Sequence, residues 1–311
     1  MHLEQTPGWP APASRIDEAR ALIAELCARG AKIAVAPHAD VDGLAAGVLA
    51  IEAIERLGGE PLVALPGKGE HVHSTPMRTR LRELQADGLI VLDMGSRRGP
   101  IVEGLPTIVL DHHDAREVPD GVVFVSAADY EPVVPTGLLA YHVLSPLANL
   151  DDLAWLAVLA AYGDLGHPFA SALGPIASRY KKTHFTEAVA LINSARRAGS
   201  YQPEVALAAL RAARGPADIA RGNSREVAQL NSLRAEVAAE VARVARVPPR
   251  VVGDVALIRF SSSAQIHPLI ATRWMQRLRP KIVLVANDGY LPGRINFAMR
   301  CAGDVDLLAF L

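Results

Sequence analysis

Short apolar runs and longer amphipathic stretches alternate through the first half of the chain. The runs have the length of buried strands, and the stretches between them have helical periodicity. Strands are predicted at residues 32–36, 61–65, 89–92 and 107–110, and helices at about residues 14–29, 43–56, 76–85, 135–144 and 150–162. Strands and helices that alternate in this way are typical of a parallel, helix-covered sheet. The first half is therefore expected to be an α/β domain.

The second half begins with helical sequence and then returns to alternating strands and helices. Residues 186–214 are rich in alanine, and residues 223–246 place apolar side chains three and four positions apart, which indicates a helix with one buried stripe. A smaller α/β unit follows, with strands predicted at residues 255–260, 281–286 and 294–299 and a helix at residues 268–277. We expect a flexible proline-rich lead at residues 1–13, a domain at 14–222, a connecting helix at 223–247 and a second domain at 248–311.

Acidic and histidine side chains recur where the apolar runs of the first half end. The most informative stretch is Asp111-His112-His113, because a carboxylate and two imidazoles at the end of a buried strand are costly to keep there without a partner. In an open α/β sheet, side chains at the carboxyl ends of the strands line one crevice and converge from distant positions. Three further segments repeat the pattern: His38-Ala39-Asp40-Val41-Asp42-Gly43, Asp93-Met94-Gly95-Ser96 and Gly163-Asp164.

A cluster of this composition predicts divalent metal ions. Carboxylates in one crevice repel one another and raise one another's pKa values unless a cation neutralises them. Carboxylate and imidazole ligands without cysteine suit Mn²⁺ or Mg²⁺, and Zn²⁺, Co²⁺ or Fe²⁺ less well. Two such ions about 3.5–4 Å apart activate water and stabilise the leaving oxygen of a phosphoryl group. The alternative is a hydrogen-bonded turn in which Asp111 simply orients a neighbouring imidazole.

At these four segments the chain resembles the DHH phosphoesterase superfamily, whose name comes from the Asp-His-His motif. The resemblance implies two ions, of which Mn²⁺ is preferred and Mg²⁺ is second, with Asp93 as the bridging ligand. In this chain only Ala39 separates His38 from Asp40, a shorter interval than in many members. By the resemblance, one ion is held by His38, Asp40 and Asp93, and the other by Asp42, Asp93, His112 and Asp164.

The same resemblance gives roles to the two residues that flank His112. His113 would face the scissile phosphate and donate a hydrogen bond or a proton, and the alternative is that it fixes the turn. Asp111 would orient a histidine rather than bind metal. His113 and Asp93 are therefore the expected catalytic residues.

Charge is distributed unevenly along the chain, although the net formal charge is only −1. Residues 1–165 carry 12 basic and 23 acidic side chains, whereas residues 166–311 carry 20 basic and 10 acidic ones. An acidic half that binds metals and a basic half that holds phosphates would suit an enzyme that acts on a polyanion. The alternative is that the arginines of the second half lie on solvated helix faces.

Two segments of the second half resemble the small DHH-associated domain of RecJ-like nucleases. They are Ala264-Gln265-Ile266-His267-Pro268 and Leu291-Pro292-Gly293-Arg294-Ile295-Asn296-Phe297. The resemblance implies that His267 and Arg294 contact substrate phosphates; alternatively, His267 packs under a helix and Arg294 is an exposed strand residue. The family usually continues into a glycine-rich GGH turn, which we expect this domain to lack because the sequence runs to Leu308-Ala309-Phe310-Leu311. A loop at residues 67–74, with one lysine and two histidines, either binds phosphate or is solvated.

These observations predict a metal-dependent phosphodiesterase or exonuclease that acts on single-stranded DNA or short oligonucleotides. The alternatives are a small-molecule phosphohydrolase, acting on a cyclic dinucleotide, a nucleoside bisphosphate or pyrophosphate, and a non-enzymatic DNA-binding scaffold. Few aromatic residues lie among the arginines, although base stacking is the usual way to hold single strands. The chain has no apolar run of about 18 residues, no signal-like start, and only Cys27 and Cys301, so we expect a cytoplasmic protein with no membrane contact and no disulfide framework.

Overall fold

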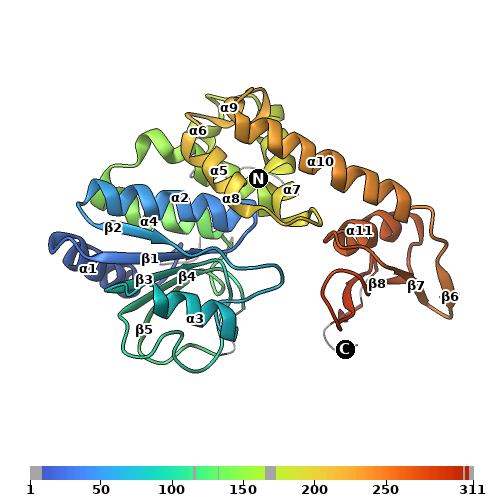
Figure 1. Ribbon diagram of the computed structural model, residues 1–311, viewed down its shortest axis with the longest axis horizontal. Helices are drawn as coiled ribbons and strands as arrows, with labels where there is room; N and C mark the ends of the chain where they lie inside the picture. Colours follow the sequence, from blue (N-terminus) through green and yellow to red (C-terminus); the bar gives the residue numbers. More distant parts are fainter. Residues whose placement is uncertain (1–8, 115–116, 132, 165–172, 304, 308–311) are drawn as a thin grey trace. The chain divides into compact units, whose positions relative to one another are not determined.

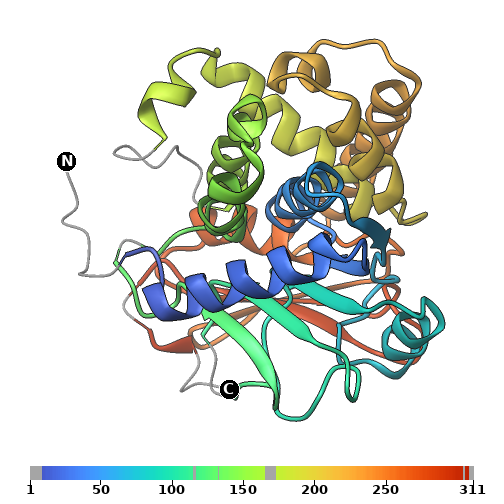
Figure 2. The same ribbon diagram turned by 90° about the vertical axis from the view of Figure 1, so that its left-hand side faces the viewer.

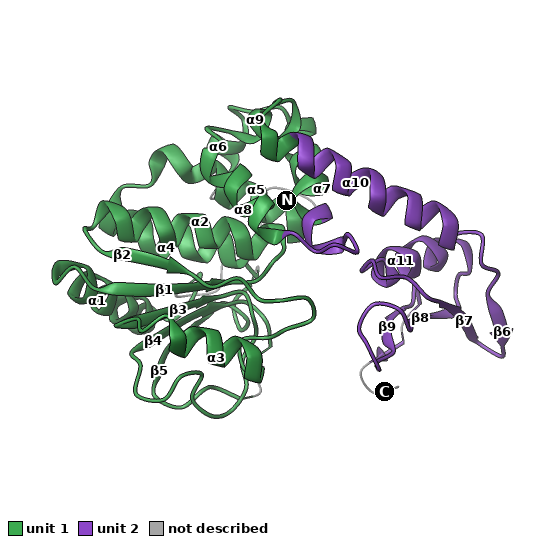
Figure 3. Ribbon diagram, in the orientation of Figure 1, with its two compact units in different colours: residues 1–193, 203–227 green, residues 194–202, 228–311 purple. Residues whose placement is uncertain are grey.

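A computed structural model describes residues 9–114, 117–131, 133–164, 173–303 and 305–307. The chain divides into two units, which are coloured separately in Figure 3. Unit 1 comprises residues 1–193 and 203–227, and unit 2 comprises residues 194–202 and 228–311. Most of the predicted N-terminal lead, and the segment Leu308-Ala309-Phe310-Leu311, lie outside the described residues.

Unit 1 is built on a five-stranded parallel sheet, so the predicted parallel α/β fold is confirmed. The strand order is β2-β1-β3-β4-β5. The strands are β1 (Lys32–Pro37), β2 (Glu60–Val63), β3 (Gly88–Leu92), β4 (Thr107–Asp111) and β5 (Val122–Ser126). The first four strands were predicted from the sequence, whereas β5 was not; it is a short edge strand in which buried and half-buried residues alternate.

Helices cover both faces of this sheet (Figures 1 and 2). On one face, α3 (Thr75–Glu83) inserts Met77 and Leu81 into a core that includes Ala34 and Val91 of the strands. On the other face lies α2 (Val41–Arg56), most of whose residues are buried because it packs against the sheet and three further helices. The remaining helices of this region are α1 (Ala13–Ala28), α4 (Thr136–Ala148), η1 (Asp151–Leu153), α5 (Ala154–Asp164), α6 (Gly174–Ala177), α8 (Pro203–Ala212) and α9 (Pro216–Ala220).

Two long helices cross the boundary between the units along the chain. The alanine-rich region at residues 186–214, which is predicted to be helical, contains most of α7 (Lys182–Arg197) and all of α8. Tyr201, with φ of +49°, lies in the turn between them. α10 (Arg225–Val244) is the helix that the apolar stripe predicts, with Leu230 and Val244 completely buried. Among the described residues, no helix is both long enough and apolar enough to cross a membrane.

Unit 2 contains a second, mixed sheet with strand order β6-β7-β8-β9, which confirms the smaller α/β unit. β7 and β8 are parallel, whereas β6 and β9 pair antiparallel at the two edges. β6 was not predicted; it forms a hairpin with β7 around Gly253, whose φ is +56°. The elements are β6 (Arg250–Val252), β7 (Val255–Phe260), α11 (His267–Arg277), β8 (Ile282–Asn287) and β9 (Asn296–Arg300).

Candidate metal centre

Three neighbouring strands of unit 1 bring the acidic and histidine motifs to one edge of the sheet. His38 follows β1, Asp93 follows β3, and Asp111 is the last residue of β4. The backbone ladder continues past the strand ends, because the amide of His38 donates to the carbonyl of Leu92 at 2.9 Å. Likewise, the amide of Asp93 donates to the carbonyl of Leu110 at 3.1 Å. Since β3 lies between β1 and β4, Asp93 occupies the middle of the cluster.

The carboxylate of Asp93 lies between three histidines. Its side chain is only 3% exposed, and its φ of +64° is a left-handed value that aspartate tolerates better than most residues do. Oδ1 lies 3.3 Å from Nε2 of His112 and accepts a hydrogen bond from Oγ1 of Thr136 at 3.1 Å. Oδ2 lies 3.6 Å from Nδ1 of His38. Oδ1 also lies 3.7 Å from Nδ1 of His113, so one oxygen of this carboxylate faces His112 and His113 and the other faces His38.

The first group of ligand atoms that lie close together comes from His38, Asp40 and Asp93. Nδ1 of His38 lies 3.0 Å from Oδ2 of Asp40. Asp40 also caps α2, because its Oδ1 accepts a hydrogen bond from the amide of Gly43 at 3.1 Å. A Cβ atom on Gly43 would lie 2.6 Å from the Cβ of His38. The glycine of this motif therefore allows the helix to start against the histidine.

His38 carries the strongest electrostatic signal in this group. Burial lowers the pKa of His38, but the carboxylates of Asp40 and Asp93 outweigh it and raise the pKa to about 10. Nδ1 is shielded from solvent and, among the residues that the structure describes, makes no contact with hydrogen-bond geometry, although a carboxylate oxygen lies 3.0 Å away. A nitrogen that faces carboxylate oxygens without a proper hydrogen bond suits a metal ligand as well as it suits a protonated imidazole.

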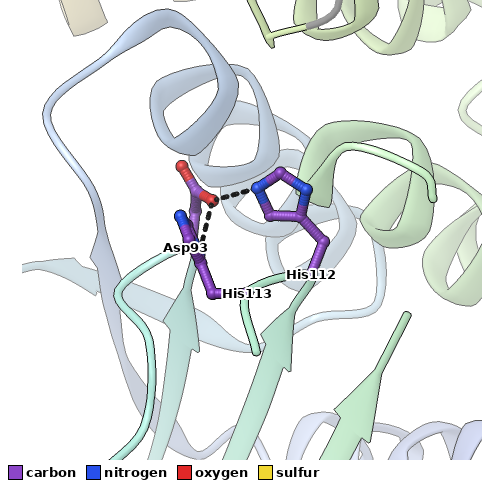
Figure 4. Close-up of side chains that lie close together, drawn as sticks. All are labelled: Asp93, His112 and His113. Atoms are coloured by element: carbon purple, nitrogen blue, oxygen red, sulfur yellow. Dashed lines mark ion pairs between the residues drawn. The ribbon is translucent and has the colours of Figure 1, made fainter. Parts of the chain in front are cut away.

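The second group consists of Asp93, His112 and His113, shown in Figure 4. Nε2 of His112 faces Asp93 and also Oδ2 of Asp42, at 3.8 Å. Nδ1 of the same ring lies 3.7 Å from Oδ2 of Asp164. Burial lowers the pKa of His112, but Asp93, Asp42 and Asp164 raise it to about 9. The four residues expected around the second ion are thus together, with Asp164 at the opposite ring nitrogen from the other two carboxylates.

Asp42 is held by the first turn of α4. Its Oδ1 accepts a hydrogen bond from the amide of Gly137 at 2.7 Å, and its Oδ2 accepts one from the amide of Thr136 at 2.9 Å. Burial and the negative charge of Asp93 raise the pKa of Asp42 well above its usual value. Each carboxylate oxygen accepts more than one contact, so these bonds orient Asp42 and leave it able to bind a cation.

Thr136 and Gly137 are site residues that the sequence analysis missed. They begin a helix that it did place, at residues 135–144, and the free amide groups of a helix N-terminus are a known attraction for carboxylates. The predicted N-terminus of this helix indicated that a carboxylate could bind there, but nothing in the sequence indicates which carboxylate contacts it.

Asp111 and His113 form a pair in which the carboxylate orients the imidazole. Oδ1 of Asp111 lies 2.8 Å from Nδ1 of His113 and accepts the His113 amide at 2.8 Å, while Oδ2 accepts the Gly95 amide at 2.6 Å. Burial raises the pKa of Asp111, but the bonds to His113 outweigh it and lower the pKa. In turn, the hydrogen bond to Asp111 raises the pKa of His113. Because the His113 side chain is 54% exposed, its ring is accessible from solvent.

Asp164 ends α5, immediately before residues 165–172, which lie outside the described residues. Burial raises the pKa of Asp164, His112 lowers it, and the charges of Asp93 and Asp40 raise it. The donor set as a whole fits divalent cations. The two groups combine two carboxylates with three histidines and contain no cysteine. The raised pKa values of Asp42 and Asp164 are the response of acids that lack a neutralising cation.

The two substrate residues predicted in the second half both lie in unit 2. His267 is the first residue of α11 and is 6% exposed, with its ring 5.8 Å from that of Tyr290. Its burial lowers its pKa to about 4. The buried ring fits the alternative that His267 packs under a helix. Nδ1 of His267 has no hydrogen-bond partner among the described residues. Arg294 is exposed in a turn just before β9.

The loop at residues 67–74 is more ordered than a solvated loop. His71 and His73 stack with ring centroids 5.5 Å apart, and the amide of His73 donates to Nδ1 of His71 at 3.2 Å. Glu70 pairs with Arg80 and accepts a hydrogen bond from the amide of Gly67 at 2.7 Å. These contacts stabilise the conformation of the loop. Phosphate binding by this loop stays a prediction.

Comparison with known proteins reveals similarity at the level of fold. No protein-family model matches the chain, and no curated protein matches it in sequence. A solved structure of the exonuclease RecJ bound to manganese superimposes with a TM-score of 0.69 at 16% identity, covering 94% of this chain and 84% of that one. RecJ from Thermus thermophilus in complex with Mn²⁺ gives a TM-score of 0.73 at 18% identity, over 96% of this chain and 49% of that one.

A third structure is the DHH domain of a member of a family of ribosomal proteins. It gives a TM-score of 0.66 at 15% identity, over 96% of this chain and 79% of that one. The chain spans about half the length of the Thermus RecJ chain and most of the other two. In its fold, and in the Asp-His-His and accompanying motifs at the strand ends, this protein resembles the DHH phosphoesterases, RecJ among them.

Proposed function

We propose that this protein is a two-metal-dependent phosphodiesterase that hydrolyses single-stranded DNA or short oligonucleotides as an exonuclease. The observation that carries the proposal is the shared carboxylate of Asp93, whose Oδ1 lies 3.3 Å from His112 and whose Oδ2 lies 3.6 Å from His38. A carboxylate with one donor group on each side is the arrangement that a bridging ligand between two cations requires.

The residues divide between the two ion sites as the motifs imply. His38, Asp40 and Asp93 would hold one cation, and Mn²⁺ is the preferred occupant with Mg²⁺ second. Asp93 would also serve the other cation, together with Asp42, His112 and Asp164. Two divalent cations held by these residues would supply an activated water molecule and would neutralise charge on the leaving oxygen. Thr136 and Gly137 keep the carboxylates of Asp93 and Asp42 in place.

His113 would act on the substrate rather than on a metal. Its Nδ1 is engaged by Asp111 at 2.8 Å, which leaves Nε2 as the atom able to donate to a phosphate oxygen or to the leaving group. The raised pKa of His113, caused by its hydrogen bond to Asp111, keeps that nitrogen protonated to higher pH. His113 is thus suited to the role of general acid.

We assign residues 14–222 to the catalytic domain and residues 248–311 to a substrate-binding domain, with the helix of residues 223–247 between them. Unit 2 has 13 basic and 6 acidic side chains, which favours a polyanionic substrate. In this domain, Arg294 is exposed and able to fork onto a phosphate. His267, whose buried Nδ1 has no hydrogen-bond partner among the described residues, is the second proposed substrate-binding residue.

The test is a substrate panel incubated with the purified protein and Mn²⁺. End-labelled single-stranded DNA, RNA dinucleotides, a cyclic dinucleotide and pyrophosphate are offered in parallel, each with and without EDTA. The proposal expects Mn²⁺-dependent release of mononucleotides from DNA. Hydrolysis of the cyclic dinucleotide or pyrophosphate alone would replace the exonuclease with the small-molecule phosphohydrolase, and no hydrolysis of any substrate would favour the scaffold.

Salt dependence provides a second, independent measurement. If the basic unit holds a strand, the affinity for a ten-nucleotide strand should fall with log[salt] at a slope of about −0.7 per contacted phosphate. Arg294→Ala should raise KM for dinucleotides as well, whereas changing Arg196 and Arg197 should raise KM only for longer strands. Equal KM values for both lengths, with equal and shallow salt dependence, would contradict strand binding.

A further inference from the structure

The four-stranded sheet of unit 2 has one covered face and one face that is exposed in part, since Ile282 and Met299 of the second face are 7% and 8% exposed. α11 packs against β8 and β9, on the face where Ile258, Val283 and Val285 are completely buried. Strand residues alternate between faces, so Arg259 and Phe297 belong to the other face. Phe297 is 54% exposed there, and Arg259 is also exposed. An aromatic ring that is exposed to this extent on a sheet marks a surface that can bind a partner.

Register places three side chains of this open face in one row across the sheet. Arg259 of β7 lies beside Ala286 of β8, and Ala286 lies opposite Phe297 of β9. With neighbouring strands about 4.8 Å apart, Arg259 and Phe297 are separated by roughly 10 Å. The methyl group of Ala286 is the floor between them. The row therefore has a small side chain in the middle, a guanidinium group at one side and an aromatic ring at the other.

The next row continues this surface. Arg250 of the edge strand β6 pairs with Leu257, and Leu257 pairs with Leu284. The strand residues on this face include two arginines and no acidic side chain. Asp288, just beyond β8, forms an ion pair with Arg259 and accepts a hydrogen bond from its guanidinium at 3.0 Å, which fixes the position of Arg259 and offsets part of its charge. Ile295, which is 59% exposed, adds apolar surface next to β9.

Size and charge indicate what this face binds. Four strands about 4.8 Å apart and three to six residues long present roughly 300 Å², well below the roughly 800 Å² that each partner of a stable protein interface buries. Unit 2 as a whole carries 13 basic and 6 acidic side chains. A small basic surface with one exposed ring suits a chain of bases and phosphates better than it suits a protein.

We propose that the open face of this sheet is a stacking platform for single-stranded nucleic acid. A base stacks on Phe297 above Ala286, and the flanking phosphates lie against Arg259 and Arg250. Because every base has a π-face, the platform would bind strands without strong sequence preference. The choice of nucleic acid rests on the proposed function, but the platform itself is distinct from the metal ligands and from His267 and Arg294.

The experiment measures binding by the whole chain with EDTA present, so that no hydrolysis is required. The probes are fluorescein-labelled dT₁₀ and an abasic strand of the same length, which has the same phosphates and no bases. Phe297→Leu removes the ring and keeps apolar bulk, whereas Phe297→Trp keeps a ring. Fluorescence anisotropy gives the Kd of each pair, and thermal unfolding checks that each variant folds.

Phe297→Leu should weaken dT₁₀ binding by roughly 5- to 150-fold, the loss expected for one stacked base. Phe297→Trp should restore it, and neither change should alter binding of the abasic strand. Arg259→Gln should weaken both strands and reduce the salt slope by about 0.7. The platform is refuted if Phe297→Leu binds dT₁₀ like the parent, if both strands weaken equally, or if the parent does not bind dT₁₀.

Two further outcomes separate this proposal from others. A parent protein that binds dT₁₀ through Phe297 but hydrolyses no substrate with Mn²⁺ would refute the proposed function and keep the platform. A parent protein that hydrolyses DNA, with Phe297→Leu binding unchanged, would refute the platform and keep the function. If sedimentation velocity shows that Phe297→Leu abolishes self-association and leaves dT₁₀ binding intact, the face is a contact between copies of the chain.

Discussion

Replacing His113 with alanine separates metal binding from proton transfer. Nδ1 of His113 is engaged by Asp111 at 2.8 Å, and its side chain is 54% exposed. Removing the ring should therefore leave both ion sites filled, because Asp93 and His112 keep their contacts with the rest of the cluster. The variant loses only the group that donates to the substrate.

The size of the effect follows from that role. A positioned general acid contributes roughly 10²–10⁴-fold to kcat, so His113→Ala should lower kcat by that factor with little change in Mn²⁺ stoichiometry. Asp111→Asn should lower kcat less, but it places an amide NH₂ group against the backbone amide of Gly95 or of His113. A buried pair of facing donors costs about 1–3 kcal/mol of unfolding free energy. A drop in melting temperature should therefore accompany Asp111→Asn and not His113→Ala.

The pH profile tests the same pair. The hydrogen bond to Asp111 raises the pKa of His113, and a general acid works only while protonated, so kcat should fall as pH rises through that pKa. Asp111→Asn removes the charge that raises the pKa, which should move this alkaline limb to lower pH.

The assay is single-turnover hydrolysis of a labelled dinucleotide with saturating Mn²⁺ between about pH 6 and pH 10, a range that brackets the titration of a histidine whose pKa is raised. Isothermal titration calorimetry counts the ions bound. His142→Ala is the matched control, because His142 is an exposed histidine of unit 1 that is not part of either ligand group, and its kcat should equal that of the parent. Loss of an ion from His113→Ala would reassign His113 as a metal ligand, and an unchanged kcat would remove it from catalysis.

Three other changes test the rest of the centre. Asp93→Ala should abolish turnover and lower the Mn²⁺ count, and activity within about threefold of the parent would contradict the two-metal assignment. Because the pKa values of His38 and His112 are raised to about 10 and about 9 by their carboxylate neighbours, protons compete with cations below those values. Mn²⁺ affinity should therefore rise about tenfold per pH unit for each proton released between about pH 6 and pH 8, and calorimetry that gives equal affinities would refute this competition. Thr136→Val deletes the hydrogen bond to Asp93 and should lower the unfolding free energy, measured by urea denaturation, by about 1.5–3 kcal/mol. Thr272→Val in α11 is the control and should lower it less, because the hydrogen bond of Thr272 at 3.0 Å is exposed. Equal losses of unfolding free energy would show that the contact with Asp93 is unimportant.

Much of the fold was predictable from local sequence patterns. Continuous apolar runs such as β3 and β4 identify strands buried on both faces, because only strands covered by helices on both sides lack the alternation of polar residues. β5 and β6 were missed because an edge strand is short and partly exposed, so its pattern differs little from that of a loop.

The candidate site was predictable as a set of residues but not as a geometry. Parallel strands deliver their carboxyl ends to one edge, so the motifs after β1, β3 and β4 had to meet there. What the sequence could not indicate is that Asp93 takes a left-handed φ of +64° and turns its two oxygens toward different histidines. Nor could it indicate that the first turn of α4 holds Asp42.

By itself, then, the sequence determined which side chains end the strands, because hydrophobic periodicity and charge are local properties of the chain. Only the tertiary structure decided which of them touch, since contacts depend on strand order, helix placement and side-chain direction over distances of many residues. The open face of the second sheet is the clearest case. Arg259, Ala286 and Phe297 are far apart in sequence and form one row only because β7, β8 and β9 pair in this register.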